Sequence, residues 1–346
     1  MFLRNAWYVA AWDHEVTRTL QPVQILGDRI VLYRTNAGAP VALEDACPHR
    51  KLPLSMGQIK GDEIECGYHG LVFNSTGQCT RIPGATKIPR VLCVRNYPVV
   101  SQYGLVWIWM GEATHAHANP ILEIEHWNNP AWDKNKGGTM TVDCNYLYVT
   151  DNLLDPTHVA WVHRSSFASE ACEEQPIDVA ASAEGVVASR WMCDAEVAPF
   201  YRQLVTFEGR CDRLQHYEVR FPSHAVIKAV FVPAGTGGRD KPLDEKALVM
   251  DSYNFMTPID ESRTKYFWFQ MRNRFAGDES VSKAMDDGVR EAFAEDQVVL
   301  AAVHRGFANK VTRNFDLAID RAPLLFRRRI AELIEAEQPK AVEAAR

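Results

Sequence analysis

The sequence lacks the features of a membrane or nucleic-acid-binding protein. No apolar run approaches the roughly 18 residues of a membrane span, and the apolar N-terminus Met1–Asp13 has neither the h-region nor the cleavage site of a signal peptide. Basic excess is also absent: 38 Lys and Arg face 44 Asp and Glu, a net charge of −6. These absences predict a cytoplasmic protein that binds neither membrane nor nucleic acid.

A disulfide framework is absent as well. Eight cysteines in 346 residues are too sparse for one, so most are expected to be free thiols or metal ligands. No internal repeat or low-complexity tract occurs. The apolar content of 47% and the nine tryptophans are sufficient for real cores, and the length suggests two domains.

The pattern along the chain predicts an α+β protein of two parts. Residues 1–112 are predicted to be all-β, with short strands and many Gly and Pro turns. The small, polar stretch 111–120 marks the boundary. In 113–346 the pattern predicts helices over 145–162, broken at Pro156, over 280–304, and from near Pro323. Strands are expected near 186–193, 201–208, 214–221, 225–232, 247–256 and 264–272.

Two short motifs in the first part carry metal chemistry, Cys47-Pro-His49 and Cys66-Gly-Tyr-His69. Each supplies one thiolate and one imidazole on a turn-rich loop. A Rieske [2Fe–2S] centre needs this set, because two cysteines hold one iron and two histidines hold the other. Neutral histidine ligands give such a cluster a potential of about −150 to +300 mV, which suits transfer of electrons from a reductase.

Two alternatives compete with this interpretation. The first is a structural zinc site, but such a site would normally pair Cys with Cys and His with His, in contrast to the mixed pairs here. The second is that the four residues occur together by chance. The remaining cysteines have no such pairing and are interpreted as small thiols of the core.

A second group of candidate ligands is Asp155, His158 and His163, within the run Asp151–His163. Asp155 and His158 can share a helical face. His158 and His163 are five apart, which is about 140° around a regular helix. They would therefore meet at one metal only if the helix is interrupted, and Pro156 offers an interruption.

Two histidines need a carboxylate to form the 2-His-1-carboxylate site of non-haem Fe(II) oxygenases. Spacing alone does not choose it. The candidates lie on the helix predicted over 280–304 and are Asp286, Asp287, Glu291, Glu295 and Asp296.

The chain resembles the α subunits of Rieske non-haem iron oxygenases over nearly its whole length. The resemblance rests on Trp7–Ala11, Cys47–Arg50, Cys66–Gly70, Asp151–His158 and Glu295-Asp296. It is strongest to the smaller homo-oligomeric group, which includes vanillate and dicamba O-demethylases and toluenesulfonate methyl-monooxygenase. The family implies an N-terminal Rieske domain and a C-terminal helix-grip domain, in which a curved antiparallel sheet lies over a mononuclear Fe(II).

The resemblance also implies residue roles. His158, His163 and Asp296 would be the iron ligands, and Asn152 would lie close to the iron. Asp155 would bridge His69 of a neighbouring subunit to His158, in a head-to-tail homotrimer. The implied partners are an NAD(P)H-dependent flavin or ferredoxin-type reductase, O₂ and a small aromatic substrate.

The implied reaction is demethylation or hydroxylation of a methoxy or methyl group on a vanillate-like aromatic acid. Cis-dihydroxylation of an aromatic ring is the alternative within the family, and a Rieske electron-transfer protein is the alternative outside it. His224 and Asn254 are candidates to bind the acid group. Asn254 stands where dicamba demethylase would offer a histidine, so dicamba is not the expected substrate. Residues 47–95 carry seven basic and three acidic side chains, which favours an acidic reductase domain as partner.

Overall fold

The structure, a computed structural model, describes residues 1–239, 241–311 and 313–338. The chain divides into two compact units. Of the described residues, unit 1 contains 1–124, 257–261 and 336–338, and unit 2 contains those of 125–256 and 262–335. No described helix combines the length and the apolar character needed to cross a membrane.

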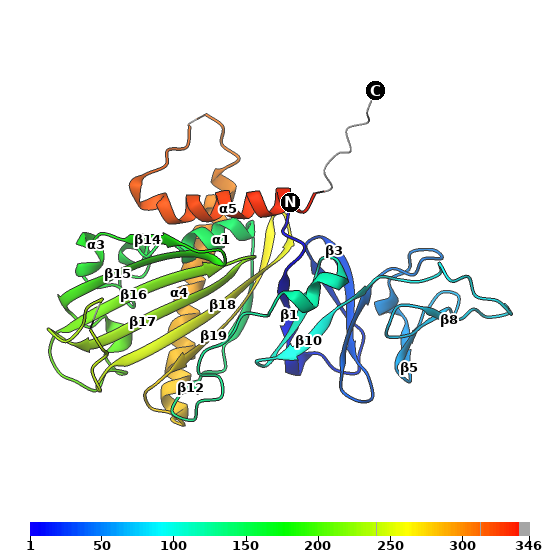
Figure 1. Ribbon diagram of the computed structural model, residues 1–346, viewed down its shortest axis with the longest axis horizontal. Coiled ribbons are helices and arrows are strands. Elements are labelled where there is room, and N and C mark those ends of the chain that lie inside the picture. The colour runs from blue at the N-terminus through cyan, green and yellow to red at the C-terminus, as the bar shows by residue number, and fades with distance from the viewer. Residues whose placement is uncertain (240, 312, 339–346) are drawn as a thin grey trace. The chain divides into compact units, whose positions relative to one another are not determined.

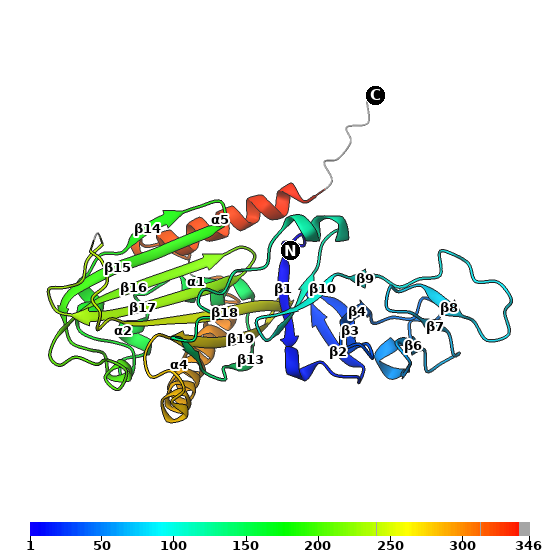
Figure 2. The same ribbon diagram turned by 60° about the horizontal axis from the view of Figure 1, so that its bottom comes forward.

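Unit 1 consists of short antiparallel strands in three sheets (Figure 2). The first has the order β1 (Trp7–Trp12), β11 (Leu105–Trp109), β10 (Val99–Gln102). The second has the order β2 (Gln21–Ile25), β3 (Asp28–Arg34), β4 (Pro40–Glu44), β9 (Asn96–Tyr97). The third is a meander of β5 (Gln58–Lys60), β6 (Glu63–Glu65), β7 (Val72–Phe73) and β8 (Cys79–Arg81). The 3-10 helices η1 (Asp13–Glu15), η2 (Leu54–Met56) and η3 (Ala113–Ala118) complete the unit.

Unit 2 is organised around one eight-stranded antiparallel sheet (Figure 1). Its order is β12-β19-β18-β17-β16-β15-β14, with β13 also paired to β19. The strands are β12 (Asp133–Lys134), β13 (Gly138–Val142), β14 (Asp178–Ala181), β15 (Gly185–Ala195), β16 (Cys211–Arg220), β17 (His224–Pro233), β18 (Leu248–Asp260) and β19 (Arg263–Arg272). The last residues of β18, from Thr257, group with unit 1.

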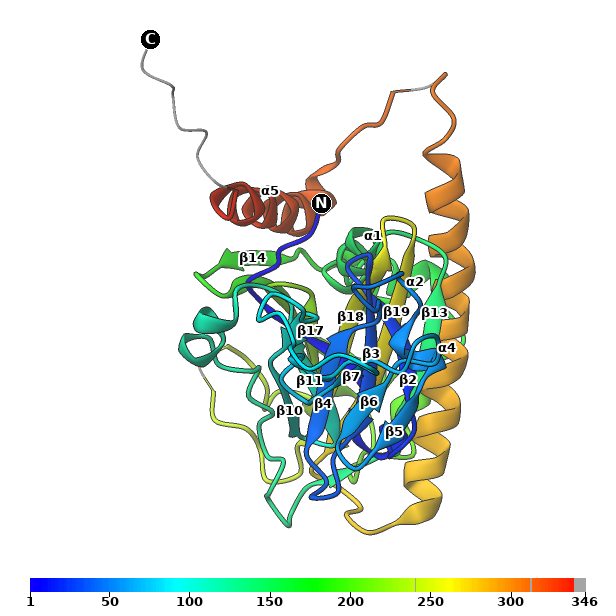
Figure 3. The same ribbon diagram turned by 90° about the vertical axis from the view of Figure 1, so that its right-hand side faces the viewer.

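Five α-helices accompany this sheet: α1 (Tyr146–Leu153), α2 (Val159–Val162), α3 (Ala171–Glu174), α4 (Glu279–Gly306) and α5 (Arg321–Ala336), with η4 (Pro199–Tyr201) and η5 (Ala318–Asp320). The long helix α4 lies alongside β13 (Figure 3). Its Phe293 ring packs 5.2 Å from Tyr266 and 5.1 Å from Trp268 of β19. A long helix held against a large antiparallel sheet confirms the predicted α+β fold with its helix-grip part.

One predicted strand is wrong. Residues 201–208 form η4 and turns instead of a strand. Pro199 presets a helical φ at the start of η4, and the carbonyl of Tyr201 then accepts from the amides of Leu204 at 2.9 Å and Val205 at 3.1 Å. Local turn hydrogen bonds therefore replace the strand that the apolar residues suggested.

Candidate metal centres

The two Cys/His loops of unit 1 have the same backbone design. In each, the cysteine amide donates to the leucine carbonyl five residues on, Cys47 to Leu52 at 2.9 Å and Cys66 to Leu71 at 2.8 Å. The cysteine carbonyl accepts from the residue four on, Lys51 at 2.8 Å and Gly70 at 3.1 Å.

Both of those closing residues have left-handed backbones, with φ of 61° at Lys51 and 68° at Gly70. Glycine adopts this conformation freely, whereas lysine adopts it at some cost. The matched turns bring the two loops together, so that each presents a cysteine and a histidine in the same manner.

The four side chains of these loops separate by depth. Cys47 and Cys66 are each 2% exposed and belong to the hydrophobic cluster that includes Leu54 and Phe73. The His49 and His69 rings are exposed and lie 4.5 Å apart between centroids.

Burial raises the pKa of the Cys47 thiol, and the adjacent Cys66 raises it further. Because the thiolate is the form that binds a metal, a cation held by the two close sulfurs would take the place of their protons. Two buried thiols and two exposed imidazoles therefore fit the ligand set of a Rieske [2Fe–2S] cluster, which Cys47, Cys66, His49 and His69 would hold.

The second candidate centre lies in unit 2, where α2 is a single turn. His158 is its N-cap and His163 its C-cap, and the backbone of His163 leaves the helical region at φ −110° and ψ 38°. The break expected at Pro156 separates α1 from α2 and precedes both histidines, so it is the end of α2 at His163 that lets the two rings approach to 5.3 Å between centroids. Ending the helix at His163 removes the 140° separation of a regular helix.

Asp296 of α4 completes the set. Its Oδ1 lies 3.3 Å from Nε2 of His163 and 3.8 Å from Nε2 of His158. The three potential ligand atoms lie within 4.8 Å of one another. All three side chains are shielded from solvent, since His163 is 5% and Asp296 is 6% exposed and His158 is partly buried. This is the spacing of two imidazoles and one carboxylate about one metal ion.

The other ring nitrogens are engaged elsewhere. Nδ1 of His158 contacts the backbone carbonyl of Asp155, and Nδ1 of His163 lies 2.7 Å from Oε2 of Glu295. Both histidines therefore turn Nε2 toward Asp296, as metal-binding histidines do when a second partner fixes the ring. Burial lowers the pKa of His163, but Asp296 and Glu295 outweigh burial and raise it overall. Such an anionic environment favours a bound cation.

The remaining carboxylates considered on α4 have other partners or face solvent. Asp286 accepts from the amide of Gly137 at 3.0 Å. Asp287 pairs with Lys283 in an exposed i,i+4 ion pair, and Glu291 is exposed. The fold thus brings only Asp296 of the five candidates to the two histidine Nε2 atoms.

Asn152 and Asp155 lie beside this set. The amide of Asn152 donates to Oδ1 of Asp296 at 3.1 Å. The Asp155 carboxylate accepts from the amide of Thr157 at 2.8 Å and from its hydroxyl. Within the chain, Asp155 therefore reaches His158 through its carbonyl, and its carboxylate shapes the turn before α2.

A cavity opens next to His158, His163 and Asp296, between α1–α2, the sheet and α4. Its wall is mainly apolar and aromatic, with Phe167, Tyr201, Tyr217, Ile227, Met250 and Phe293. The polar side chains in the wall are Asn152, Arg213, Ser252 and Asn254. Apolar walls with few polar groups are typical of sites for small organic ligands.

The two acid-binding candidates from the sequence have different environments. His224 does not line this cavity. Asn254 does, but its amide donates to Ser252 O at 2.9 Å and its Oδ1 accepts from the Tyr266 hydroxyl at 2.9 Å. Sequence reasoning missed Arg213, because its strand pattern gives no sign that an arginine points inward.

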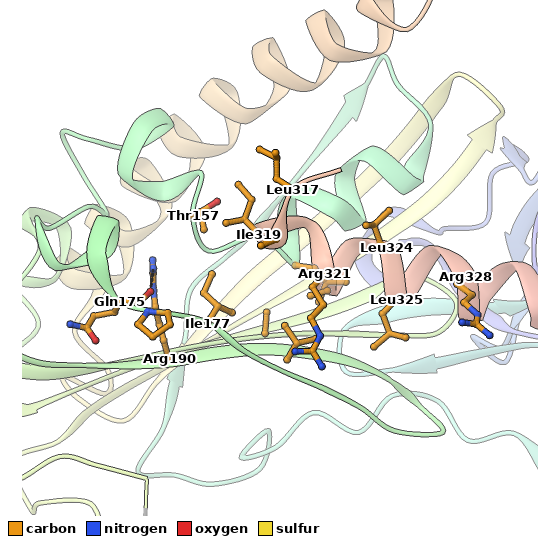
Figure 4. Close-up of a pocket in the computed structure, with 16 residues that line it drawn as sticks. Thr157, Gln175, Ile177, Arg190, Leu317, Ile319, Arg321, Leu324, Leu325 and Arg328 are labelled. Atoms are coloured by element: carbon orange, nitrogen blue, oxygen red, sulfur yellow. Dashed lines mark hydrogen bonds between the residues drawn. The ribbon is translucent and has the colours of Figure 1, made fainter. Parts of the chain in front are cut away.

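A larger cavity of about 1000 Å³ lies between α5, η5, the edge strand β14 and its neighbour β15 (Figure 4). Leu317, Ile319 and Leu324 project into it together with Arg321 and Arg328. No described group of metal-ligating residues lines it. The candidate site is therefore the smaller cavity beside the histidines, which is identified by its metal-ligating residues and not by its volume.

Another potential ligand group, Glu125, His126 and Asp251, lies on the opposite face of the sheet. Met250 and Ser252 face the cavity, so Asp251 between them faces away. The Lys228 ammonium lies 3.3 Å from Glu125 and 3.7 Å from Asp251. That ammonium already supplies the counter-charge, so this group is interpreted as an ion-pair network.

Comparison with known families assigns the class of protein. The Rieske [2Fe–2S] domain family matches residues 6–98, and the vanillate O-demethylase oxygenase C-terminal domain family matches residues 142–336. The chain therefore belongs to the Rieske non-haem iron oxygenases, oxidoreductases that combine a Rieske [2Fe–2S] cluster with a mononuclear iron.

Individual relatives agree with this class. The chain is 35% identical over 306 residues to the toluene-4-sulfonate monooxygenase system iron–sulfur subunit of Comamonas testosteroni, covering 87% of this chain and 88% of that one. It is 34% identical to a vanillate O-demethylase oxygenase subunit of a Pseudomonas strain, covering 100% and 98%. The crystal structure of dicamba monooxygenase bound to 3,6-dichlorosalicylic acid superimposes with a TM-score of 0.90 at 30% identity, covering 98% and 99%.

Proposed function

We propose that this chain is the oxygenase component of a monooxygenase that demethylates or hydroxylates the methoxy or methyl group of a small aromatic acid. The observation that carries the proposal is the buried set of His158, His163 and Asp296 beside an apolar cavity. Relatives named for vanillate O-demethylation and toluene-4-sulfonate oxidation support the substrate class.

In this proposal Cys47, Cys66, His49 and His69 hold the cluster in residues 1–112. His158, His163 and Asp296 hold Fe(II) in residues 113–346. When bound, the iron supplies the site where O₂ is activated with two electrons from the cluster side. Asn152 orients Asp296 through its 3.1 Å hydrogen bond, and Glu295 fixes the His163 ring. The apolar wall excludes water around the bound arene.

The overall reaction balances without further reactants. An aryl methyl ether, O₂, two electrons and two protons give a hemiacetal and water, and the hemiacetal collapses to a phenol and formaldehyde. An aryl methyl group under the same conditions gives a benzylic alcohol. Which carbon reacts depends on how the cavity places the ring.

The electrons come from an NAD(P)H-dependent flavin or ferredoxin-type reductase, which places the enzyme in the cytoplasm where that nicotinamide is maintained. Residues 47–95 carry net charge +4 in a chain of −6 overall, which suits an acidic docking domain. The chains form a head-to-tail homotrimer, in which Asp155 connects the cluster of one subunit to the iron of the next.

The test is product analysis with the purified protein, a compatible reductase and ¹⁸O₂, on a panel of methoxy- and methyl-benzoates. We expect formaldehyde from the ethers and ¹⁸O in benzylic alcohols. A cis-dihydrodiol as the main product would instead identify a ring dioxygenase. Iron analysis should give three iron atoms per chain, whereas an electron-transfer protein would hold two.

A further inference from the structure

Arg213 of β16 is the polar side chain in the cavity wall whose partners are least complete. It is 1% exposed and lines the same cavity as His158, His163 and Asp296. Nη1 donates to the Phe167 carbonyl at 3.0 Å and lies 3.6 Å from the Cys172 sulfur. Its Nε is buried without a hydrogen-bond partner among the described residues.

The other buried arginines of unit 2 have different partners. Arg190 donates to Gln215 at 2.7 Å and to two backbone carbonyls at 3.0 and 3.1 Å. Arg272 has a carboxylate partner, Asp133 at 3.1 Å, although its Nε and Nη1 are also buried without hydrogen-bond partners among the described residues. No described carboxylate lies within 4.0 Å of Arg213, so its charge lacks the anionic partner that buried cations normally have.

Burying a guanidinium without a counter-charge is costly, because desolvation is not repaid by an attractive partner. Aromatic faces offset part of this cost: the guanidinium lies 5.4 Å from the Tyr201 ring centroid and 5.0 Å from that of Phe231. These faces and the Phe167 carbonyl also fix its direction. The result is a pre-oriented donor with free capacity, and a planar guanidinium is well matched to a two-oxygen anion.

Arg213 is connected to the metal-binding set through one residue. The Phe167 ring lies 6.0 Å from the His163 ring, and the carbonyl of the same residue holds Nη1 of Arg213. His163 and Arg213 also line the same cavity, so an aromatic acid bound there can meet both the metal-binding set and Arg213. Asn254 cannot fill this role without giving up its hydrogen bonds to Ser252 and Tyr266.

We propose that Arg213 is the specificity-determining residue that binds the acid group of the substrate, and that the substrates are arenes that carry a carboxylate or sulfonate. This inference rests on the proposed function, since it assigns the anion subsite of the same cavity. Binding the acid would give Arg213 its counter-charge and hold the ring in register with the metal.

The test measures binding apart from turnover. Calorimetry on the anaerobic holoenzyme compares benzoate and benzenesulfonate with neutral benzamide, none of which carries a methyl group. Wild type is expected to prefer the anions. Arg213→Met should weaken binding of the anions on the order of 100-fold and leave benzamide nearly unchanged. Comparable benzoate and benzenesulfonate losses would define one oxyanion subsite, and loss of only one anion would identify the acid group that it accepts.

Arg190→Met is the matched control, because that buried arginine is satisfied by the protein and should leave the preference for anions intact. Arg213→Lys keeps the positive charge but lacks the planar guanidinium, so it should retain part of the preference for anions over benzamide. This variant also covers the case in which Arg213→Met fails to fold. Persistence of the full preference in either Arg213 variant would overturn the proposal. Arg213-dependent binding of benzoate together with a cis-dihydrodiol product would contradict only the proposed reaction.

Discussion

At the residue scale, the adjacent carboxylates Glu295 and Asp296 have different tasks. Asp296 is buried and faces the Nε2 atoms of His158 and His163. Glu295 is about one-third exposed, with a side-chain accessibility of 34%, and approaches His163 from the other ring nitrogen. In the proposed site, Asp296 would therefore bind the iron and Glu295 would orient the His163 ring.

Removing the orienting carboxylate should weaken iron binding without touching the cluster. We expect Glu295→Ala to lower the affinity of the mononuclear site by about 10–100-fold, with Glu295→Gln in between because its amide oxygen still accepts from Nδ1. Glu291→Ala, one turn earlier and exposed, is the control. The measurement is Fe(II) titration of chelator-treated protein that keeps its Rieske absorption. Equal affinity in the Ala variants would contradict the role.

Asp155 combines a structural contact with a proposed electronic one. Asp155→Asn retains Oδ1, so the hydrogen bonds from Thr157 and the turn before α2 should persist. The charge is lost, however, and we expect both metal sites to be filled while turnover falls to a few per cent or less. Stopped-flow reoxidation of the reduced cluster by O₂ and substrate should show the block. Wild-type turnover would leave Asp155 as a turn residue only.

The buried carboxyl of Asp251 should lower the free energy of unfolding by an amount that depends on pH. Burial raises its pKa to about 6 although Lys228 and His126 oppose the shift, and Glu125 adds to it. The native state therefore holds this proton over a range in which the unfolded chain releases it, so the cost is absent below about pH 4, grows through pH 6 and is complete above it.

Because two pKa units correspond to about 3 kcal/mol, Asp251→Asn should stabilise unit 2 more at pH 8 than at pH 5, by about 1 kcal/mol. Thermal unfolding midpoints at the two pH values measure this, with the exposed Asp287→Asn as control. A stabilisation that is the same at both pH values would show that the carboxyl does not titrate in this range.

At the element scale, the position of α4 against η4 depends on a glycine inside the helix. A Cβ built on Gly288 would lie 2.7 Å from Cε2 of Phe200, and that ring packs 4.4 Å from Phe167 of the cavity wall. The helix therefore approaches the cavity closely at Gly288, where it lacks a side chain.

Gly288→Ala should destabilise the protein although alanine is the better helix former. Helix propensity would favour alanine by about 1 kcal/mol, but overpacking against Phe200 costs about 1–3 kcal/mol and should displace the wall that supports Arg213. Gly306→Ala, at the end of the same helix with no atom within 4 Å, should be neutral or stabilising. Denaturant midpoints compare the two variants. A more stable Gly288→Ala would show that Phe200 moves aside freely.

At the scale of the whole molecule, the proposed head-to-tail trimer makes two defective chains complementary. Cys66→Ser should destroy the cluster and Asp296→Asn should disable the mononuclear site, so each homotrimer should be inactive. In a mixed trimer one junction joins an intact cluster to an intact iron site. A trimer that contains both chains therefore has one working junction of three, which predicts about a third of wild-type activity.

The two chains carry different tags, are co-expressed and are purified through both tags, and turnover is then measured. The control is a mixture of the two homotrimers, each purified separately. Activity no higher than that of either parent would contradict transfer between subunits.

The sequence by itself determined the class of this protein and predicted the cysteine and histidine ligands of its two candidate centres, because ligand chemistry is local. Two short motifs supply Cys47, His49, Cys66 and His69, and their residue types and spacing predict a cluster. One helical turn separates His158 from His163, which indicates a metal site. Strands were also predicted correctly where apolar and polar residues alternate. The strand predicted over 201–208 was wrong, because Pro199 and local hydrogen bonds form a turn there.

The tertiary structure decided what depends on contacts between distant segments. Only the packing of α4 against α2 distinguishes Asp296 from the other four acidic candidates and turns Glu295 to the far side of His163. Likewise, only the direction of β16 in the sheet buries Arg213 in the cavity wall without a carboxylate. A strand pattern states that alternate residues share a face, but the desolvation and pairing of a charge depend on every element that meets that face.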